Sequence, residues 1–252
     1  METNNLIRIQ FEESVKFMGF NNTSNLIEDF SEYHRLILEW NSKINLISSK
    51  SVDDIFERHF LDSLSVHLVN TIFKGNSNMD FMKVLDVGTG AGLPGIPLKI
   101  VMPKLKLTLL DATSKKIDFL KIVCSELLLS NVDFILDRAE RAAHLKPYRG
   151  DFDLVVSRAV ADLKILVEFM IPFCKTGGLI VAMKGEKAEQ EVKEALPAIR
   201  ALGGDNVEII DSSSHHPFLK GRLVVIRKVA ETPSNYPRRV GIPHKRPLTG
   251  LS

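Results

Sequence analysis

VLDVGTGAGLPG, residues 84–95, decides the fold of this chain. An apolar run ends in Asp86, and three glycines then follow at alternate positions, namely Gly88, Gly90 and Gly92. Alternate glycines let the backbone turn tightly and approach a ligand with no Cβ in the way. The stretch therefore predicts a strand that runs into a ligand-binding loop.

A second strand and a second acid follow at the distance that such a loop requires. The apolar run Leu105–Leu110 ends in Asp111. Strand, glycine loop, helix, strand and acid are the layout of a βαβ unit that binds a nucleoside, and the second acid accepts hydrogen bonds from ribose hydroxyls. A glycine turn without a ligand would not need Asp111, so we disfavour that interpretation.

The kind of nucleoside follows from Asp86. Residues 90–95 also match the dinucleotide pattern G-x-G-x-x-G, in which the first glycine directly ends the strand and the loop admits a pyrophosphate. Here an acid stands two residues before Gly88. A carboxylate repels a pyrophosphate but suits the cationic amino-acid end of S-adenosylmethionine. The sequence favours S-adenosylmethionine over a nicotinamide dinucleotide.

Composition adds mild limits. The chain has 252 residues, of which 44% are hydrophobic and 25% charged, as in an ordinary soluble globular protein. It has no apolar run long enough to span a bilayer, and residues 1–13 lack the pattern of a signal peptide. Cys124 and Cys174 have no metal-ligand spacing and fall in apolar patterns, which predicts buried free thiols. We expect a cytoplasmic protein.

Charge is unevenly distributed along the chain. Residues 1–80 hold 7 Lys and Arg against 12 Asp and Glu, whereas residues 213–252 hold 8 against 1. The basic end suggests a polyanionic substrate whose phosphates it would contact. The candidate contacts are Arg222, Arg227, Arg238, Arg239, Lys245 and Arg246. Two alternatives stay open: a solvated tail, or a tail paired with the acidic N-terminal region.

The chain reads as an N-terminal helical part and an alternating α/β part. One helix is expected from Leu26 to Ile44, capped by Asn25 or Ser24, and another over Val52–Phe73. The polar residues 75–80 mark the boundary. The expected strands are 83–87, 106–110, 132–136, 154–157, 179–183, 207–211 and 222–228. The expected helices between them are 94–102, 115–129, 163–169 and 187–202.

This alternation predicts a parallel sheet with right-handed crossovers. The last two strands have no helix between them, so an antiparallel strand should close the sheet. Dinucleotide folds more often end in a parallel strand, which again favours a methyltransferase.

Chemistry is expected at the carboxyl ends of the parallel strands. After the third strand come residues 137–140, DRAE, where a backbone amide and the Glu140 carboxylate can contact adenine. The alternative for Glu140 is an acid that stabilises a helix N-terminus. After the fourth strand Arg158 would lie close to both cofactor and substrate, and its alternative is a surface ion pair.

Two motifs are missing where other nucleic-acid methyltransferases need them. No Asn or Asp before Pro-Pro-aromatic follows the fourth strand, and neither cysteine follows a proline. A ring nitrogen such as guanine N7 has a lone pair ready for attack, so its methylation needs positioning and no obligatory base. The sequence therefore predicts a shallow pH dependence. His59 is interpreted as a structural rather than a catalytic residue.

Six segments together resemble the bacterial methyltransferases that modify guanine N7 in small-subunit ribosomal RNA, also called glucose-inhibited division protein B. The resemblance covers nearly the whole chain, with mild departures at Leu93, where Phe is commoner, and at Asp137, where Gly is commoner. The matching segments are WNSKINL (40–46), RHFLDSL (58–64), DVGTGAGLPGIP (86–97), RAE (138–140), SRAV (157–160) and YPRRVGIP (236–243).

The resemblance implies a fold, a cofactor and a substrate. The fold is α/β, a Rossmann-like class I S-adenosylmethionine-dependent methyltransferase with an N-terminal helical extension over residues 1–80, a core over 81–230 and a basic tail over 231–252. The substrate is 16S ribosomal RNA, within the small subunit or an assembly intermediate, with no metal and no membrane. The implied cofactor contacts are Gly88, Leu93, Asp111, Ala112, Thr113, Ala139, Glu140 and Arg158, of which Arg158 is also catalytic.

Two other classes remain possible on the sequence. One is a nicotinamide-dependent oxidoreductase, which would bind NADH. The other is a nucleic-acid-binding protein that keeps the fold without catalysis, against which the intact loop and both acids argue.

Overall fold

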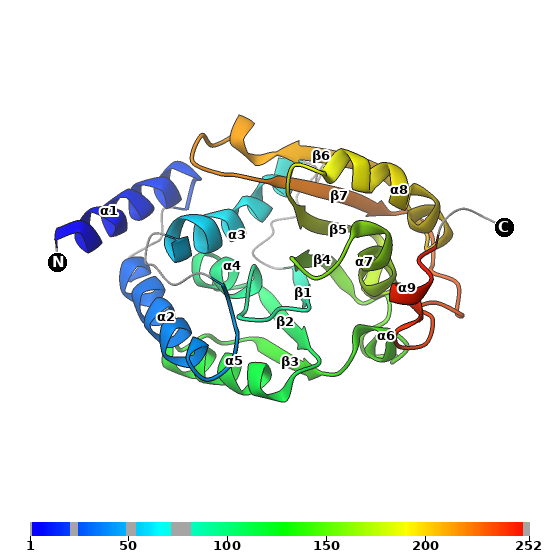
Figure 1. Cartoon of the computed structure of the whole chain (residues 1–252), viewed down its shortest axis with the longest axis horizontal. Coiled ribbons are helices and arrows are strands. Elements are labelled where there is room, and N and C mark those ends of the chain that lie inside the picture. The colour runs from blue at the N-terminus through cyan, green and yellow to red at the C-terminus, as the bar shows by residue number, and fades with distance from the viewer. Residues whose placement is uncertain (1, 21–24, 49–53, 72–81, 249–252) are drawn as a thin grey trace.

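A computed structural model describes residues 2–20, 25–48, 54–71 and 82–248 of the chain. Its centre is a seven-stranded sheet with the order β3-β2-β1-β4-β5-β7-β6 (Figure 1). The strands are β1 (Lys83–Val87), β2 (Lys106–Asp111), β3 (Val132–Leu136), β4 (Phe152–Arg158), β5 (Cys174–Lys184), β6 (Gly204–Asp211) and β7 (Arg222–Lys228). The first five strands are parallel, and β7 is antiparallel to both β5 and β6. The expected parallel sheet with an antiparallel finish is confirmed.

Every expected strand is present, and three have the expected bounds. The largest difference is at β5, which begins at Cys174 instead of Leu179. Cys174 pairs with Phe152 at the start of β4, and the register shifts before Leu154 pairs with Leu179. The intervening residues include two glycines and two polar residues, so no apolar pattern marks this part of the strand.

Helices cover both faces of the sheet. They are α4 (Gly95–Val101), α5 (Ser114–Glu126), α6 (Ala139–Ala142), α7 (Leu163–Met170), η4 (Ile171–Phe173), α8 (Ala188–Ala201), η5 (Ser212–Ser214) and α9 (Ile242–Lys245). Side chains alternate across the strands, so Leu154 and Val156 of β4 face one core and Val155 the other. The helices α6, α7 and α8 pack on the second core. Strands buried on both faces explain why the sequence shows continuous apolar runs.

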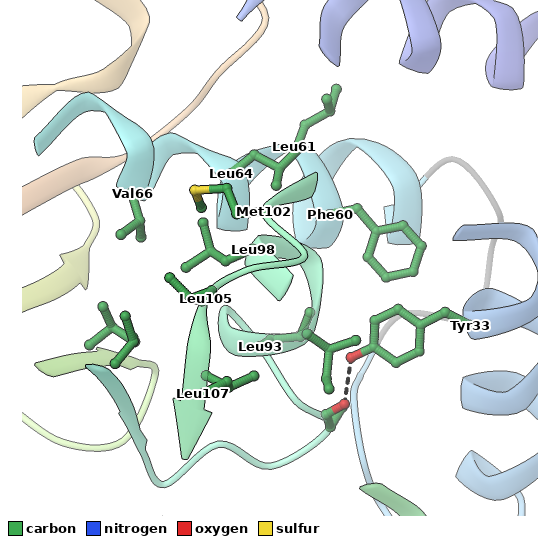
Figure 2. Close-up of a cluster of buried hydrophobic side chains, with 14 of the residues drawn as sticks. Tyr33, Phe60, Leu61, Leu64, Val66, Leu93, Leu98, Met102, Leu105 and Leu107 are labelled. Atoms are coloured by element: carbon green, nitrogen blue, oxygen red, sulfur yellow. Dashed lines mark hydrogen bonds between the residues drawn. The ribbon is translucent and has the colours of Figure 1, made fainter. Parts of the chain in front are cut away.

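The N-terminal helices share the first core with the sheet. They are α1 (Glu2–Phe17) and α2 (Leu26–Asn41), and α2 lies beside α5 in Figure 1. The expected apolar face of α2 is buried at Phe30, Tyr33 and Ile37. The Tyr33 hydroxyl donates a 2.6 Å hydrogen bond to the Ala91 carbonyl, which ties this helix to the glycine loop (Figure 2). Asn25 precedes the helix but its side chain makes no capping hydrogen bond.

The expected single helix over residues 52–73 is wrong. The described part winds as a π-helix, η1 (Asp54–Leu61), then one turn of α-helix, α3 (Asp62–Leu64), then a 3₁₀ helix, η2 (Ser65–Thr71). The hydroxyls of Ser63 and Ser65 donate to the carbonyls of His59 and Asp62 and so compete with regular helical hydrogen bonding. Residues 75–80, the expected boundary, lie outside the described residues.

Two further expectations concern the burial of the cysteines and the presence of helices that could span a membrane. Cys124 and Cys174 are buried free thiols, as predicted. In the described ranges, none of the helices combines the length and apolar character that crossing a membrane requires.

Candidate functional site

A pocket of about 560 Å³ opens at the carboxyl ends of β1, β2, β3 and β4. This is the edge at which open parallel sheets bind ligands. Six of the eight expected cofactor contacts line it together, namely Gly88, Asp111, Ala112, Thr113, Ala139 and Glu140. The apolar side chains Val87, Leu110, Val160 and Phe169 line it as well. The pocket thus offers polar groups at its edge and apolar walls that suit a nucleoside base.

Gly88 forms part of the wall at a place where any side chain would crowd Val160. Its φ is +68°, in the left-handed region, and a Cβ at this position would lie 2.6 Å from Cγ2 of Val160. Any larger residue would push Val160, which also lines the pocket. The glycine pattern therefore keeps the loop close to the neighbouring β4 end.

Asp86 organises the loop from behind. It is fully buried and does not line the pocket, and its Oδ2 accepts hydrogen bonds from the Thr89 hydroxyl at 2.7 Å and from the Gly95 amide at 2.9 Å. Burial raises the pKa of Asp86 to about 7, although these two hydrogen bonds lower it. Its Oδ1 is buried with no partner among the described residues. Oδ2 of Asp86 therefore supports the loop, and the expected contact of this carboxyl group with the cationic end of a cofactor stays a prediction.

Asp111 joins the loop to the second strand. Its Oδ2 accepts from the Gly90 amide at 3.1 Å and its Oδ1 from the Thr113 amide at 2.9 Å. The Lys116 ammonium lies 3.8 Å from Oδ2. A carboxylate has about four acceptor positions, so Asp111 retains capacity for ligand hydroxyls in the pocket that it lines.

The C-terminal segment completes the pocket, which the sequence did not predict. Val240, Gly241 and His244 line it, and the Gly241 amide donates to Oε1 of Glu140 at 3.1 Å. Residues 231–248, which we call the C-terminal strap, lie beside α6 and α7 (Figure 1).

Two arginines hold the strap in place. Arg238 donates from its backbone amide and from its guanidinium to Glu168, a fully buried carboxylate on α7, at distances of 2.6 to 3.2 Å. Arg149 donates to the backbone carbonyls of Thr232, Pro233 and Tyr236. The strap arginine at 238 therefore pairs with α7 and not with the acidic N-terminal helices.

Arg158 lies in a neighbouring pocket, not in the first one. Its guanidinium donates to the His59 carbonyl at 3.1 Å, contacts His59 Nδ1 at 3.1 Å and lies 3.3 Å from Oδ2 of Asp62. Burial lowers the pKa of Arg158, against the opposing effect of Asp62. The segment 58–64 thus meets the end of β4, and the contact with Arg158 fits the structural interpretation of His59.

Leu93 is the other expected contact outside the first pocket. Its side chain is buried in the core among α2 and η1 residues, near Tyr33 and Phe60 in Figure 2. Within the described ranges, no cluster of three or more His, Cys, Asp and Glu side chains could hold a metal ion.

Comparisons with known proteins give consistent results. A family model described as rRNA small subunit methyltransferase G (GidB) matches residues 26–231. Ribosomal RNA small subunit methyltransferase G of Alkaliphilus oremlandii is 41% identical over 237 residues, covering 94% of this chain and 97% of that protein. The protein of the same name from Desulforamulus reducens is also 41% identical and covers 97% of this chain and 99% of its own length.

A solved structure shares the fold. Geranyl diphosphate C-methyltransferase from Streptomyces coelicolor, in complex with S-adenosyl-L-homocysteine, matches with a TM-score of 0.50 and 14% identity over 78% of this chain and 98% of that chain. This likeness concerns the architecture of sheet and helices.

Proposed function

Since the chain belongs to the family of rRNA small subunit methyltransferases G, we propose that it transfers the methyl group of S-adenosyl-L-methionine to N7 of a guanine in 16S ribosomal RNA. The family and the extent of the match make it an enzyme of the methyltransferase class. The observation that supports the cofactor most directly is the first pocket, where Asp111 and Glu140 flank apolar walls at the ends of β2 and β3.

The residues divide the binding task. Asp111 is placed to accept from ribose hydroxyls, and the segment Ala112–Thr113 borders the adenine. Ala139 and Glu140 contact the adenine edge, while Gly88 keeps the wall open. Leu93 supports the loop from the core side, since its side chain is buried there. The unpartnered Oδ1 of Asp86 suits a cationic donor at the amino-acid end.

The chemistry requires orientation more than proton transfer. When bound, S-adenosyl-L-methionine supplies a methyl group activated by its sulfonium. Guanine N7 carries a lone pair and no proton, so no base is needed before it attacks the methyl group. The chain has to align the base with the methyl group and exclude water. Arg158, at the end of β4, is the candidate for orienting the substrate side of this arrangement. The product base carries a positive charge.

The finer identity of the substrate is part of the proposal. We propose that the RNA is presented within the small ribosomal subunit or an assembly intermediate in the cytoplasm. The exposed basic residues of the strap, Arg239, Lys245 and Arg246, are candidates for phosphate contacts.

Calorimetry and mass spectrometry test the proposal. Purified protein should bind S-adenosyl-L-methionine and not NADH, and digests of treated 16S RNA or small subunits should contain 7-methylguanosine. Single-turnover rates should change little between pH 7 and 9, where an essential base would give a steep limb. Binding of NADH alone, or a methylated product other than 7-methylguanosine, would contradict it.

A further inference from the structure

A second pocket of about 520 Å³ lies directly beside the first. Ala159 lines both pockets, and its φ of +55° marks the turn by which the chain leaves β4. The second pocket is bordered by the ends of β4 and β5 and by the start of β7, among them Arg158, Met183 and Leu223. A molecule held there would be separated from a molecule in the first pocket by Ala159.

Asp62 presents a carboxylate to this second pocket. Its Oδ2 lies 3.3 Å from the Arg158 guanidinium, and in the part of the chain that the structure describes Arg158 is the one side chain that pairs with it. Its Oδ1 lies near Gly221, where an added Cβ would be 3.5 Å from this oxygen and 3.2 Å from the Lys184 carbonyl. With glycine at position 221, no Cβ stands against Oδ1 on this side.

Arg158 holds the carboxylate from one side only. Its guanidinium also contacts His59 of η1 and Ser63 of α3, which helps to fix its direction. Burial raises the pKa of the Asp62 carboxyl to about 6, although Arg158 lowers it. A half-buried carboxylate with unused acceptor positions gains from further donors.

Guanine supplies the matching donors. Its Watson–Crick edge carries the N1–H and the N2 amino group side by side, and both can donate to one carboxylate. Adenine has an acceptor at N1 and cannot make this pair. A guanine held by that edge has its N7 on the far side of the base, away from the carboxylate.

We propose that the second pocket receives the target guanine and that Asp62 accepts hydrogen bonds from its N1–H and N2 amino group, with N7 turned toward Ala159. This rests on the proposed function and names the residue that selects the base. Arg158 is then a positioning residue that orients Asp62. Exposed Lys220, which also lines this pocket, suits a flanking phosphate.

The first experiment changes the RNA and leaves the protein intact. After the methylated guanine is mapped, it is replaced by inosine, which keeps N7, O6 and N1–H and lacks the N2 amino group. The RNA is used naked or reconstituted into small subunits, whichever form the native enzyme methylates. We expect kcat/KM to fall at least about tenfold, equal to about 1.4 kcal/mol. Equal rates on guanine and inosine would overturn the proposal.

The second experiment couples this change to the protein. In Asp62→Asn the ratio of guanine to inosine rates should fall toward one, while S-adenosyl-L-methionine affinity stays within about twofold of the native value. A structural role for Asp62 would lower both rates together and leave the ratio unchanged, which would also overturn the proposal. Glu194→Gln is the matched control and should keep the native ratio. Glu194 is an exposed acid on α8 whose carboxylate lies 2.8 Å from the Lys164 ammonium.

The role of Asp62 and the proposed function are overturned by different results. If the native enzyme methylates guanine N7 but does not discriminate inosine, only the role of Asp62 is overturned. If the enzyme binds S-adenosyl-L-methionine but methylates no guanine in naked 16S RNA or in small subunits, the proposed function is overturned together with the role of Asp62.

Discussion

Gly88 and Gly150 adopt the same left-handed backbone in different surroundings. Their φ values are +68° and +63°, but an added Cβ meets Val160 at Gly88 and nothing within 4 Å at Gly150. Replacing either glycine with alanine costs about 1–2 kcal/mol of stability because L residues disfavour this conformation. Only at Gly88 does the new methyl group also crowd a wall of the first pocket, the proposed cofactor site.

The pair Gly88→Ala and Gly150→Ala therefore separates strain from loss of binding. We expect S-adenosyl-L-methionine affinity to fall more than about tenfold in Gly88→Ala, equal to about 1.4 kcal/mol, and to stay native in Gly150→Ala. Calorimetry gives the affinities and thermal melting the stabilities. Equal affinities in both variants would remove Gly88 from the binding site.

Asp86 makes stability depend on pH. Because burial raises its pKa from 3.8 to about 7, the folded protein retains a proton between these values that the unfolded chain has already lost. The free energy of unfolding should therefore fall as pH rises through this window, by at most about 1.4 kcal/mol per pH unit for this one group. Asp62 acts in the same direction, with a pKa raised to about 6.

Asp86→Asn should remove the Asp86 share. The amide oxygen can still accept from Thr89 and Gly95, so the loop can persist. We expect the stability of the variant relative to the native protein to increase by about 1 kcal/mol or more between pH 5 and pH 8, measured by urea unfolding. Asp118→Asn, at an exposed acid, serves as the control. Parallel curves for native protein and Asp86→Asn would show that this group does not titrate as described.

Among the elements, the C-terminal strap contributes three residues to the lining of the first pocket. Arg238→Ala would leave the Glu168 carboxylate buried without its partner, and breaking such a pair costs about 3–5 kcal/mol. The strap should loosen and withdraw Val240, Gly241 and His244 from the pocket. We expect a lower melting temperature together with weaker S-adenosyl-L-methionine binding.

Arg239→Ala is the matched control, because Arg239 is exposed. It should keep stability and cofactor affinity, and any effect on RNA binding would be specific to phosphate contact. The double variant Glu168→Ala with Arg238→Ala removes the uncompensated charge and should recover part of the stability without recovering the affinity. Native cofactor affinity in Arg238→Ala would show that the pocket does not depend on the strap.

For the molecule as a whole, local signals predicted most of the sheet and its ligand edge. The apolar runs and the turn residues around Gly88 are local signals, each contained in a short stretch of sequence. Together they predict the strands and the loop of a βαβ unit. The change of helix type within residues 54–71 could not be predicted. The hydroxyls of Ser63 and Ser65 donate to backbone carbonyls, and the sequence does not show which serines will make such bonds. The strap depends on Arg238 reaching Glu168, 70 positions away in sequence, and no periodic pattern encodes such a contact.

The surroundings of Arg158 could not be predicted either, because they too depend on residues that are distant in sequence. Its place at the end of β4 was predicted from the strand pattern, but which of two pockets it faces depends on Asp62 and His59, from a separate helical segment. The candidate contacts were therefore found from the sequence at the level of the sheet edge, while their division between two pockets required the structure.

The single wall at Ala159 has a consequence for inhibitor chemistry. Two ligands that occupy pockets on either side of one residue can be joined by a short covalent linker. An adenosine and a guanine connected in this way would bind as one bivalent molecule, because anchoring of the first half raises the effective concentration of the second to about the millimolar range. Such a compound would draw its selectivity from the spacing between the two halves, a property that adenosine analogues alone do not have.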